Sequence, residues 1–367
     1  MNKRTHRRGV LVIAPAKGRG GIASVIRLHS QTNAWKSMGC SLLSTYDDRS
    51  VFRKLLAAAK SYVAAPLLVS NANIVHIHLA AQKSVFRKLP FILLAKLFRK
   101  PLIIHVHAFS VESLFDETAF RAGQFALRFA DRVVALSQSW ADVMSARDSS
   151  LKITVIPNPV DTRPLLLNQS KLDTLAILFA GKLEIRKGYQ DLLVAAVSVL
   201  KRFPSAQFWF AGHGDLEIAS AMAEQFGIDK SVKFMGWLGT HEMAAAYETA
   251  SIFCLPSYHE GVPMAVLEAM GHGLPVVCTR VGGLPDYIEQ MRNGLFANAG
   301  DPASIADGIV YLLSNPTNAG LIGRRAAESI HASCGLSVIS QYLEDLYAEI
   351  YGEYADGVLA AHGTSLS

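Results

Sequence analysis

Residues 256–287 read PSYHEGVPMAVLEAMGHGLPVVCTRVGGLPDY, a stretch in which two carboxylates, Glu260 and Glu268, lie eight positions apart. Pro263 suits the first position of a helix, because its missing N–H would have no partner inside the helix. The stretch therefore predicts a helix from Pro263, with Glu260 in the loop before it and Glu268 about one and a half turns inside it. Gly261 lets the backbone approach a ligand closely, and the first amides of the helix favour an anion. These features predict a site for a ligand that carries both phosphate and hydroxyl groups.

Short apolar runs rich in β-branched residues alternate with longer helical patterns along the whole chain. This alternation is typical of βαβ units, in which helices cover a sheet of parallel strands. Six strands are predicted in each half, which favours an α/β protein with two Rossmann-like, doubly wound parallel sheets. The predicted strands are residues 9–14, 41–45, 74–77, 102–106, 132–135, 153–156, 175–180, 207–211, 232–234, 251–254, 276–278 and 294–296.

The chain has 367 residues, of which 50% are hydrophobic, and this length favours two domains. Residues 157–171 contain three prolines and little periodicity, so they are the predicted join. We expect an N-terminal domain over residues 1–165 and a C-terminal domain over residues 166–335. The amphipathic segment 336–360 is predicted to be a helix that joins the N-terminal domain and could pack across both.

Composition argues against several classes of protein. No run of 18 or more apolar residues occurs, and the short apolar run near the N-terminus lacks a small-residue cleavage site. The four cysteines are scattered without the spacing of a zinc site, so we expect reduced thiols and no metal. The sequence therefore predicts a cytoplasmic protein.

The charge is distributed unevenly along the chain. Residues 1–165 contain 24 Lys and Arg against 9 Asp and Glu, whereas the remainder contains 12 against 21. The basic half predicts an anionic partner, and without a nucleic-acid-binding motif a membrane surface or a lipid pyrophosphate fits better. Residues 85–100, VFRKLPFILLAKLFRK, fit either an ordinary crossover helix with a solvated basic face or a helix that contacts a membrane.

A glycine-rich loop follows the first predicted strand and contains Gly18, Gly20 and Gly21. The run GRGGIA also satisfies the pattern G-x-G-x-x-A, and Asp47 and Asp48 end the next strand. A dinucleotide-binding fold over residues 9–48 is therefore an alternative interpretation.

Motifs spread over nearly the whole chain resemble the retaining glycosyltransferases of family 4. This resemblance implies the GT-B architecture, with two Rossmann-like domains facing across a cleft. It also implies transfer of a hexose or N-acetylhexosamine from a nucleotide diphosphate sugar to an acceptor hydroxyl, with retention of configuration and without a metal. The motifs are Gly20-Gly21, His107, IPNPVD at 156–161, Gly181-Lys182, Lys187-Gly188, Gly212-x-Gly214, the opening stretch 256–287 and NGLF at 293–296.

The resemblance implies a role for each charged residue. Lys182 and Lys187 would stabilise the leaving diphosphate, although Lys182 stands where many members carry Arg and so loses the two-pronged contact of a guanidinium. Glu268 would accept hydrogen bonds from the ribose hydroxyls. Glu260 would contact the transferred sugar near its reacting carbon.

The remaining implied roles concern neutral groups. His107 would hydrogen-bond the sugar near the reaction centre, whereas His105 is expected to point the other way and to be structural. His78 is a weaker candidate on the acceptor side. Further donor-binding residues would be Gly20 and Gly21, Gly212, Trp237 beside the nucleobase, and the run Gly261, Val262, Pro263 and Met264; a core position is the alternative for Trp237.

These inferences define the expected partners and leave other functions open. The donor would be a UDP- or GDP-sugar, and the acceptor a lipid-linked glycan of bacterial polysaccharide or glycolipid synthesis. The enzyme would then act in the cytoplasm or on the inner face of the membrane. The alternatives are a nucleotide-sugar epimerase of the same architecture, an NAD-binding oxidoreductase and a silent binding protein.

Overall fold

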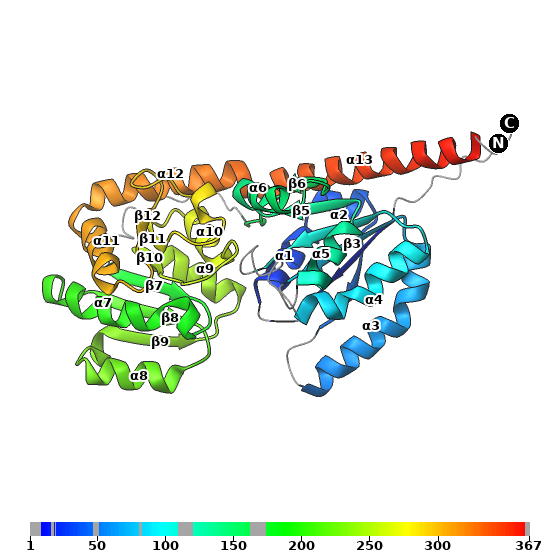
Figure 1. Ribbon diagram of the computed structural model, residues 1–367. Coiled ribbons are helices and arrows are strands. Elements are labelled where there is room, and N and C mark those ends of the chain that lie inside the picture. The colour runs from blue at the N-terminus through cyan, green and yellow to red at the C-terminus, as the bar shows by residue number, and fades with distance from the viewer. Residues whose placement is uncertain are drawn as a thin grey trace. The chain divides into compact units, whose positions relative to one another are not determined.

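The computed structural model describes residues 9–15, 18, 20–46, 51–80, 83–108, 120–161 and 174–363 (Figure 1). The chain divides into two compact units, the first comprising residues 1–159 and 334–367 and the second residues 160–333. Each unit contains a six-stranded parallel sheet with helices around it, so the predicted α/β fold with two doubly wound sheets is confirmed.

The sheet of the first unit has the strand order β2-β1-β3-β4-β5-β6. The order reverses between β1 and β3, which makes this pair the topological switch point of the sheet. The strands are β1 (Val10–Ala14), β2 (Ser41–Ser44), β3 (Ile74–Leu79), β4 (Leu102–Val106), β5 (Arg132–Ala135) and β6 (Ile153–Val155).

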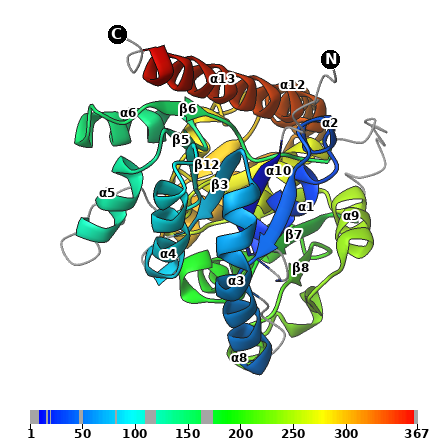
Figure 2. The same cartoon turned by 90° about the vertical axis from the view of Figure 1, so that its right-hand side faces the viewer.

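The described helices of the first unit lie on both faces of its sheet (Figure 2). One face packs against α1, α2 and α13 in a continuous apolar core that includes Val12, Ile26 and Leu346. On the other side α3 contacts α4, and α4 contacts α5. The helices are α1 (Gly21–His29), α2 (Asn33–Ser37), α3 (Val51–Asn71), α4 (Lys83–Leu97), α5 (Phe120–Arg128), α6 (Gln138–Arg147) and α13 (Leu336–Gly363).

The second unit repeats the same plan with the strand order β12-β11-β10-β7-β8-β9. Its switch point lies between β7 and β10. The strands are β7 (Ala176–Ala180), β8 (Gln207–Ala211), β9 (Val232–Gly236), β10 (Ile252–Leu255), β11 (Val276–Thr279) and β12 (Leu295–Ala297). The α-helices are α7 (Tyr189–Arg202), α8 (Leu216–Gln225), α9 (Thr240–Thr249), α10 (Met264–Gly271), α11 (Pro302–Ser314) and α12 (Pro316–Cys334), and a 3-10 turn, η3, spans Ile185–Lys187.

All twelve predicted strands are present within two residues of their predicted limits. The predicted C-terminal helix is also present as α13, and its apolar residues belong to the core of the first unit. Two predictions fall partly outside the described residues: the proline-rich join beyond Asp161, and the pair Asp47 and Asp48 on which the dinucleotide-binding alternative depends.

Candidate functional site

The loops after the carboxyl ends of β7 and β10 carry three of the charged residues predicted for the site, Lys182, Lys187 and Glu260. After β7 the chain passes through Gly181 and Lys182 into η3, which ends at Lys187. Gly188 then adopts φ +70°, and a Cβ at this position would lie 2.0 Å from the carbonyl oxygen of Pro256. Only glycine fits there. The close approach holds the loop after β7 against the loop after β10, at the switch point where doubly wound folds bind ligands.

Glu260 is the centre of a buried cluster of charges. Its side chain lies in the loop after β10 and is only 6% exposed. Its Oε1 forms an ion pair with Lys187 Nζ and another with Arg186 at 3.2 Å. The hydroxyl of Ser257 donates a further hydrogen bond of 3.2 Å to the same oxygen. A carboxylate at this depth requires such partners, because an unpaired buried charge is very costly.

A second carboxylate extends this cluster to Lys182. Glu184 contacts Lys182 at 3.0 Å and Arg186 at 2.6 Å. Burial raises the pKa of the Glu184 carboxyl, but hydrogen bonds from Lys182 and Arg186 outweigh burial and leave this pKa below its ordinary value. Three cations therefore face two carboxylates, and the cluster keeps an excess of positive charge. Glu184 and Arg186 were not identified from the sequence, although both lie between Lys182 and Lys187.

The segment before α10 is held by a second glycine contact. Gly282 adopts φ +56°, and a Cβ there would lie 2.0 Å from the carbonyl oxygen of Gly261 and 2.1 Å from that of Glu260. The neighbouring amide of Gly283 donates a hydrogen bond of 2.8 Å to the Gly261 carbonyl. The loop after β11 thus fixes the backbone that carries Glu260.

The start of α10 differs by one residue from the prediction. Pro263 has ψ 118°, an extended value, and the helix begins at Met264. Gly261 and Val262 lie in a bend and Pro263 is extended, so the helical conformation is reached only at Met264. Pro263 is therefore the N-cap, and its carbonyl accepts hydrogen bonds from the amides of the first turn.

Glu268 lies on α10 among buried apolar residues, as predicted, and has a specific partner. The hydroxyl of Tyr247 on α9 donates a hydrogen bond of 3.1 Å to Glu268 Oε2. Burial and the adjacent Glu268 carboxylate raise the pKa of Tyr247 well above its ordinary value, so this hydroxyl remains a donor. Tyr247 was not identified from the sequence.

Gly212 and Trp237 follow the next two strands at the same edge of the sheet. Gly212 follows β8, and its amide donates a hydrogen bond of 2.7 Å to the carbonyl of Gly236 at the end of β9. A Cβ at Gly212 would lie 1.7 Å from the carbonyl oxygen of Gly181. Trp237 is 51% exposed, so the alternative of a core tryptophan is wrong. Its ring is accessible to a ligand.

In the first unit, the predicted glycine loop leads into α1. Gly20 is the N-cap of this helix, and Gly21 is its first residue. Both are exposed, and a Cβ at Gly20 would meet no atom within 4 Å. No contact with the described residues therefore requires glycine at position 20.

His107 follows β4 and contacts His78 of β3. The two imidazoles share a hydrogen bond of 2.9 Å between His78 Nδ1 and His107 Nε2. The predicted orientation of His105 is wrong, because residues two apart in a strand point to the same face of the sheet. The rings of His105 and His107 stack with their centroids 4.4 Å apart.

These rings belong to a larger group of neighbouring histidines, which comprises the buried His29, His76, His78 and His105 and the partly buried His107. Burial lowers the pKa of His29 to about 4, and burial together with neighbouring His29 lowers that of His107 to about 3. The pKa values of the other three are lowered well below the ordinary value, first by burial and then by neighbouring histidines. The group is therefore neutral near pH 7.

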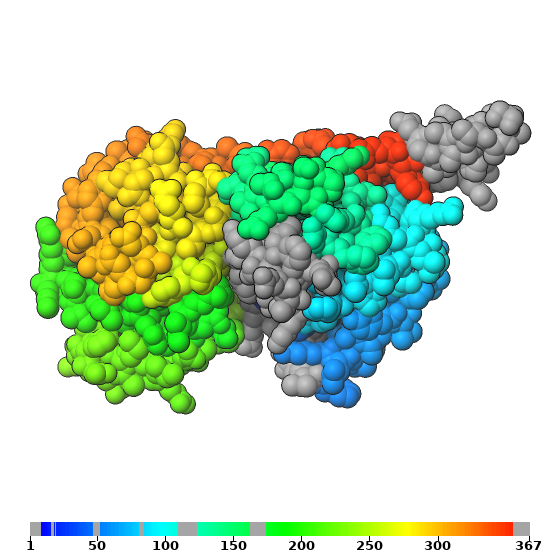
Figure 3. Space-filling view, in the orientation of Figure 1, coloured from blue at the N-terminus to red at the C-terminus, as the bar shows by residue number. Residues whose placement is uncertain are grey.

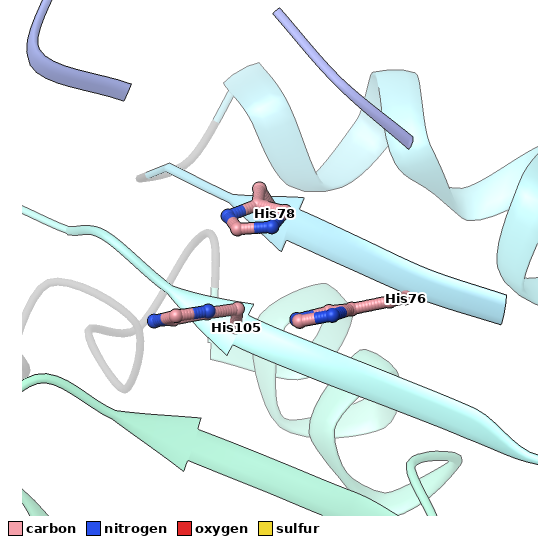
Figure 4. A group of neighbouring side chains, drawn as sticks. All are labelled: His76, His78 and His105. Carbon is pink, nitrogen blue, oxygen red and sulfur yellow. The ribbon is translucent and has the colours of Figure 1, made fainter. Parts of the chain in front are cut away.

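Three members of this group, His76, His78 and His105, bring nitrogen atoms within 4.8 Å of one another (Figure 4). Their rings are stacked, with interplanar angles between 8° and 28°. The lone pair of an imidazole lies in the plane of its ring, so stacked rings do not direct three lone pairs at a common point. This geometry does not suit a tetrahedral metal site.

Two family models match the chain, one in each half. Residues 10–163 match the model described as Glycosyltransferase Family 4, and residues 174–315 match the model described as Glycosyl transferases group 1. The chain belongs to glycosyltransferase family 4. The matches agree with the two sheets, since each model spans the strands of one of them, and the predicted family is confirmed.

Curated relatives of this family 4 chain match parts of it. A D-inositol 3-phosphate glycosyltransferase of Corynebacterium jeikeium is 36% identical over 148 residues, which are 38% of this chain and 35% of the relative. An uncharacterized glycosyltransferase of Haemophilus influenzae is 30% identical over 51% of this chain and 52% of the relative. The chain thus spans between about a third and a half of the length of the curated relatives it matches.

Solved structures share the fold over most of this family 4 chain. Anabaena HepE in complex with UDP-glucose has a TM-score of 0.77 at 18% identity, covering 93% of this chain and 99% of HepE. The sucrose-phosphate synthase of Thermosynechococcus elongatus also has a TM-score of 0.77 at 18% identity, covering 95% of this chain and all of the synthase. These similarities confirm the predicted GT-B fold.

Two further observations describe this family 4 chain. Among the described helices, none combines the length and apolar character needed to cross a bilayer. Cys40, Cys254 and Cys278 carry free thiols, as the sequence predicts.

Proposed function

We propose that the protein transfers a hexose or N-acetylhexosamine from a nucleotide diphosphate sugar to an acceptor hydroxyl, with retention of configuration. The observation that carries this proposal is the buried Glu260 carboxylate paired with Lys187 and Arg186 at the switch point of the second sheet. Cations held in place by a buried carboxylate provide a preorganised site for negative charge. A diphosphate leaving group develops such charge as its glycosidic bond breaks.

The cations would bind the donor diphosphate. Lys182 and Lys187 would contact the oxygens of the diphosphate. The three cations of the cluster outnumber its two carboxylates, so positive charge remains to neutralise the diphosphate. This arrangement would supply the charge that a divalent ion supplies elsewhere, so we propose that no metal is required.

The neutral and acidic groups would orient the sugar and the nucleoside. Glu268 would accept hydrogen bonds from the ribose, and the exposed ring of Trp237 would contact the base. Glu260 and the neutral His107 would contact the transferred sugar. Because His78 shares a hydrogen bond with His107, we propose that His78 positions this imidazole and fixes which of its nitrogens carries the proton.

The proposal also covers the nucleotide of the donor and the class of the acceptor. HepE structures contain UDP or UDP-glucose, and a structure of TarM from S. aureus contains UDP, so UDP is the first nucleotide to test, before GDP. The basic first half of the chain supports a lipid-linked glycan of polysaccharide synthesis as the acceptor. The free thiols fit the reducing cytoplasm.

The test combines thermal unfolding with sugar release. The protein is incubated with UDP, GDP and ADP and then with UDP-GlcNAc, UDP-glucose and GDP-mannose. Stabilisation by one nucleotide with slow release of its sugar is expected, and NMR of the product made with an acceptor should show the donor's anomeric configuration. A rearranged nucleotide-sugar without acceptor would identify an epimerase instead. Absence of stabilisation by every nucleotide would overturn the proposal.

A further inference from the structure

The outer face of α3 carries a continuous apolar stripe. Its members recur at intervals of three or four residues, so they share one side of the helix. All of them are exposed, and Val63 in the middle is 83% exposed. The stripe consists of Phe52, Leu55, Leu56, Ala59, Val63, Pro66 and Leu67. A helix that only covers a sheet would turn such residues inward, so this stripe requires another explanation.

The outer face of α4 repeats the pattern. Its stripe consists of Phe86, Pro90, Leu93 and Leu97, again at intervals of three or four residues, and Leu97 is 74% exposed. The buried side of the same helix carries Phe91, Ile92 and Ala95. This helix is therefore apolar on both sides.

The two stripes belong to one surface of the first unit. Tyr62 of α3 stacks on Phe91 of α4 with the ring centroids 5.2 Å apart, and its hydroxyl donates a hydrogen bond of 3.1 Å to the Arg87 carbonyl. The helices lie side by side in both ribbon views (Figures 1 and 2), and both reach the surface in the space-filling view, α3 in blue and α4 in cyan (Figure 3). We call the two stripes and the cations around them the α3–α4 surface.

The charges of the α3–α4 surface all have one sign. Neither helix contains an Asp or a Glu. Arg53 and Lys60 flank the stripe of α3, and Arg87 flanks that of α4, all three exposed. Lys96 of α4 forms an ion pair of 3.0 Å with Asp131. A second copy of this surface would bring like charges together, so self-association through it is unfavourable.

We propose that the α3–α4 surface docks on a lipid bilayer that contains anionic lipids. Exposed apolar side chains would enter the boundary between headgroups and acyl chains, while Arg53, Lys60 and Arg87 would remain among the anionic headgroups. The N-terminal ends of both helices follow the carboxyl ends of β2 and β3, at the edge of the sheet that carries His107 and Gly20. The proposal rests on the exposure and the charge of these two helices, and it does not depend on the proposed transferase activity.

The experiment is flotation of the full chain with two kinds of vesicle, pure phosphatidylcholine and phosphatidylcholine mixed with phosphatidylglycerol. Wild-type protein should float with the anionic vesicles and largely dissociate at high salt. The triple variant Leu55→Ser, Val63→Ser and Leu67→Ser should lose at least about tenfold in partition. The double variant Arg53→Ala and Lys60→Ala should lose about fivefold per cation.

Matched variants in the second unit serve as controls. Ile218→Ser removes an exposed apolar residue from α8, and the pair Lys201→Ala and Arg202→Ala removes two exposed cations from α7. Both controls should float like wild type, and every variant should keep the wild-type thermal unfolding temperature. Equal flotation of wild type and the triple variant would overturn the proposal. So would a concentration-dependent dimer that the triple variant abolishes while vesicle binding is absent.

Discussion

The two units present different chemistry at the same edge of the same kind of sheet. In the second unit, the loops after β7 and β10 carry ionised side chains, in which three cations pair with the carboxylates of Glu184 and Glu260. In the first unit, β3 and β4 carry stacked histidines that are buried and neutral. Doubly wound topology fixes where side chains gather, whereas charge and burial fix what they can bind. Under the proposed function, the charged edge would bind the diphosphate and the neutral edge would contact sugar hydroxyls.

The largest expected difference between the two units is a loss of stability at acid pH, caused by the buried histidines of the first unit. Four of them, His29, His76, His78 and His105, are buried with lowered pKa values, whereas each titrates near 6.5 when exposed. Below pH 6.5 the unfolded chain binds protons that the folded protein cannot. Stability is therefore fully present above this pH and falls toward pH 4, by about 1.4 kcal/mol per pH unit for each histidine. Urea denaturation across this range measures the slope.

His105→Leu provides the control for this prediction. Neither ring nitrogen of His105 has a hydrogen-bond partner among the described residues, so the substitution removes one titrating group and no hydrogen bond. The variant should match wild type at pH 8 and show a shallower slope below pH 6.5. An unchanged slope would show that His105 is protonated in the folded protein.

The next effect tests the charged edge. Lys187→Ala should reduce turnover by about 10²–10³-fold, by analogy with the loss of one donor that stabilises developing charge. Arg186 still pairs with Glu260 in this variant, so the fold should persist. Initial rates with saturating donor measure the loss, and Lys201→Ala on the exposed face of α7 is the matched control. A rate equal to that of wild type would remove Lys187 from the mechanism.

A smaller effect tests how the backbone fixes Glu260. Gly282→Ala places a Cβ about 2 Å from two carbonyl oxygens in the left-handed region of φ, so the loop must shift. We expect a loss of about 1–3 kcal/mol in the free energy of unfolding and weaker nucleotide binding. Gly227 has φ +67° but open space around it, so Gly227→Ala isolates the cost of φ alone. Equal nucleotide affinity for the two variants would contradict the role of this contact.

The smallest effect tests the neutral edge. His78→Phe keeps a ring in the stack and removes the hydrogen bond to His107. Turnover should fall about fivefold, the equivalent of one neutral hydrogen bond, with the KM for donor nearly unchanged. His105→Phe, which replaces a ring without such a bond, should keep wild-type turnover. Equal losses in both variants would show that packing of the rings, rather than positioning of His107, determines the rate.

The strands of both sheets could be predicted because their signal is local. A run such as residues 102–106 is apolar and β-branched, and it lies between helical patterns. The partners of the site residues are not local. Arg186 pairs with Glu260 across 74 positions, and Tyr247 meets Glu268 from another helix. No spacing rule connects such residues before the sheet order is known.

The sequence also could not show which apolar residues of the helices are exposed. The apolar residues of α3 fit a buried crossover helix as well as an exposed stripe, because both have helical spacing. Only the packing of Ser61, Ala65 and Val69 toward the sheet shows which side of this helix is inward. The orientation of His105 is a different case, since the two-residue period of a strand already determined it.

The division of the first unit into two segments also constrains the order in which the chain can fold during synthesis. Its apolar core contains Ile339, Leu343, Leu346 and Ile350 of α13 beside Val10 and Val12 of β1. The second unit, residues 160–333, is continuous and is synthesised before α13. A ribosome must therefore release the last element of the first core only after the whole second unit has emerged. Until then only α1 and α2 cover this face of the N-terminal sheet, which reverses the usual order in which N-terminal domains complete folding first.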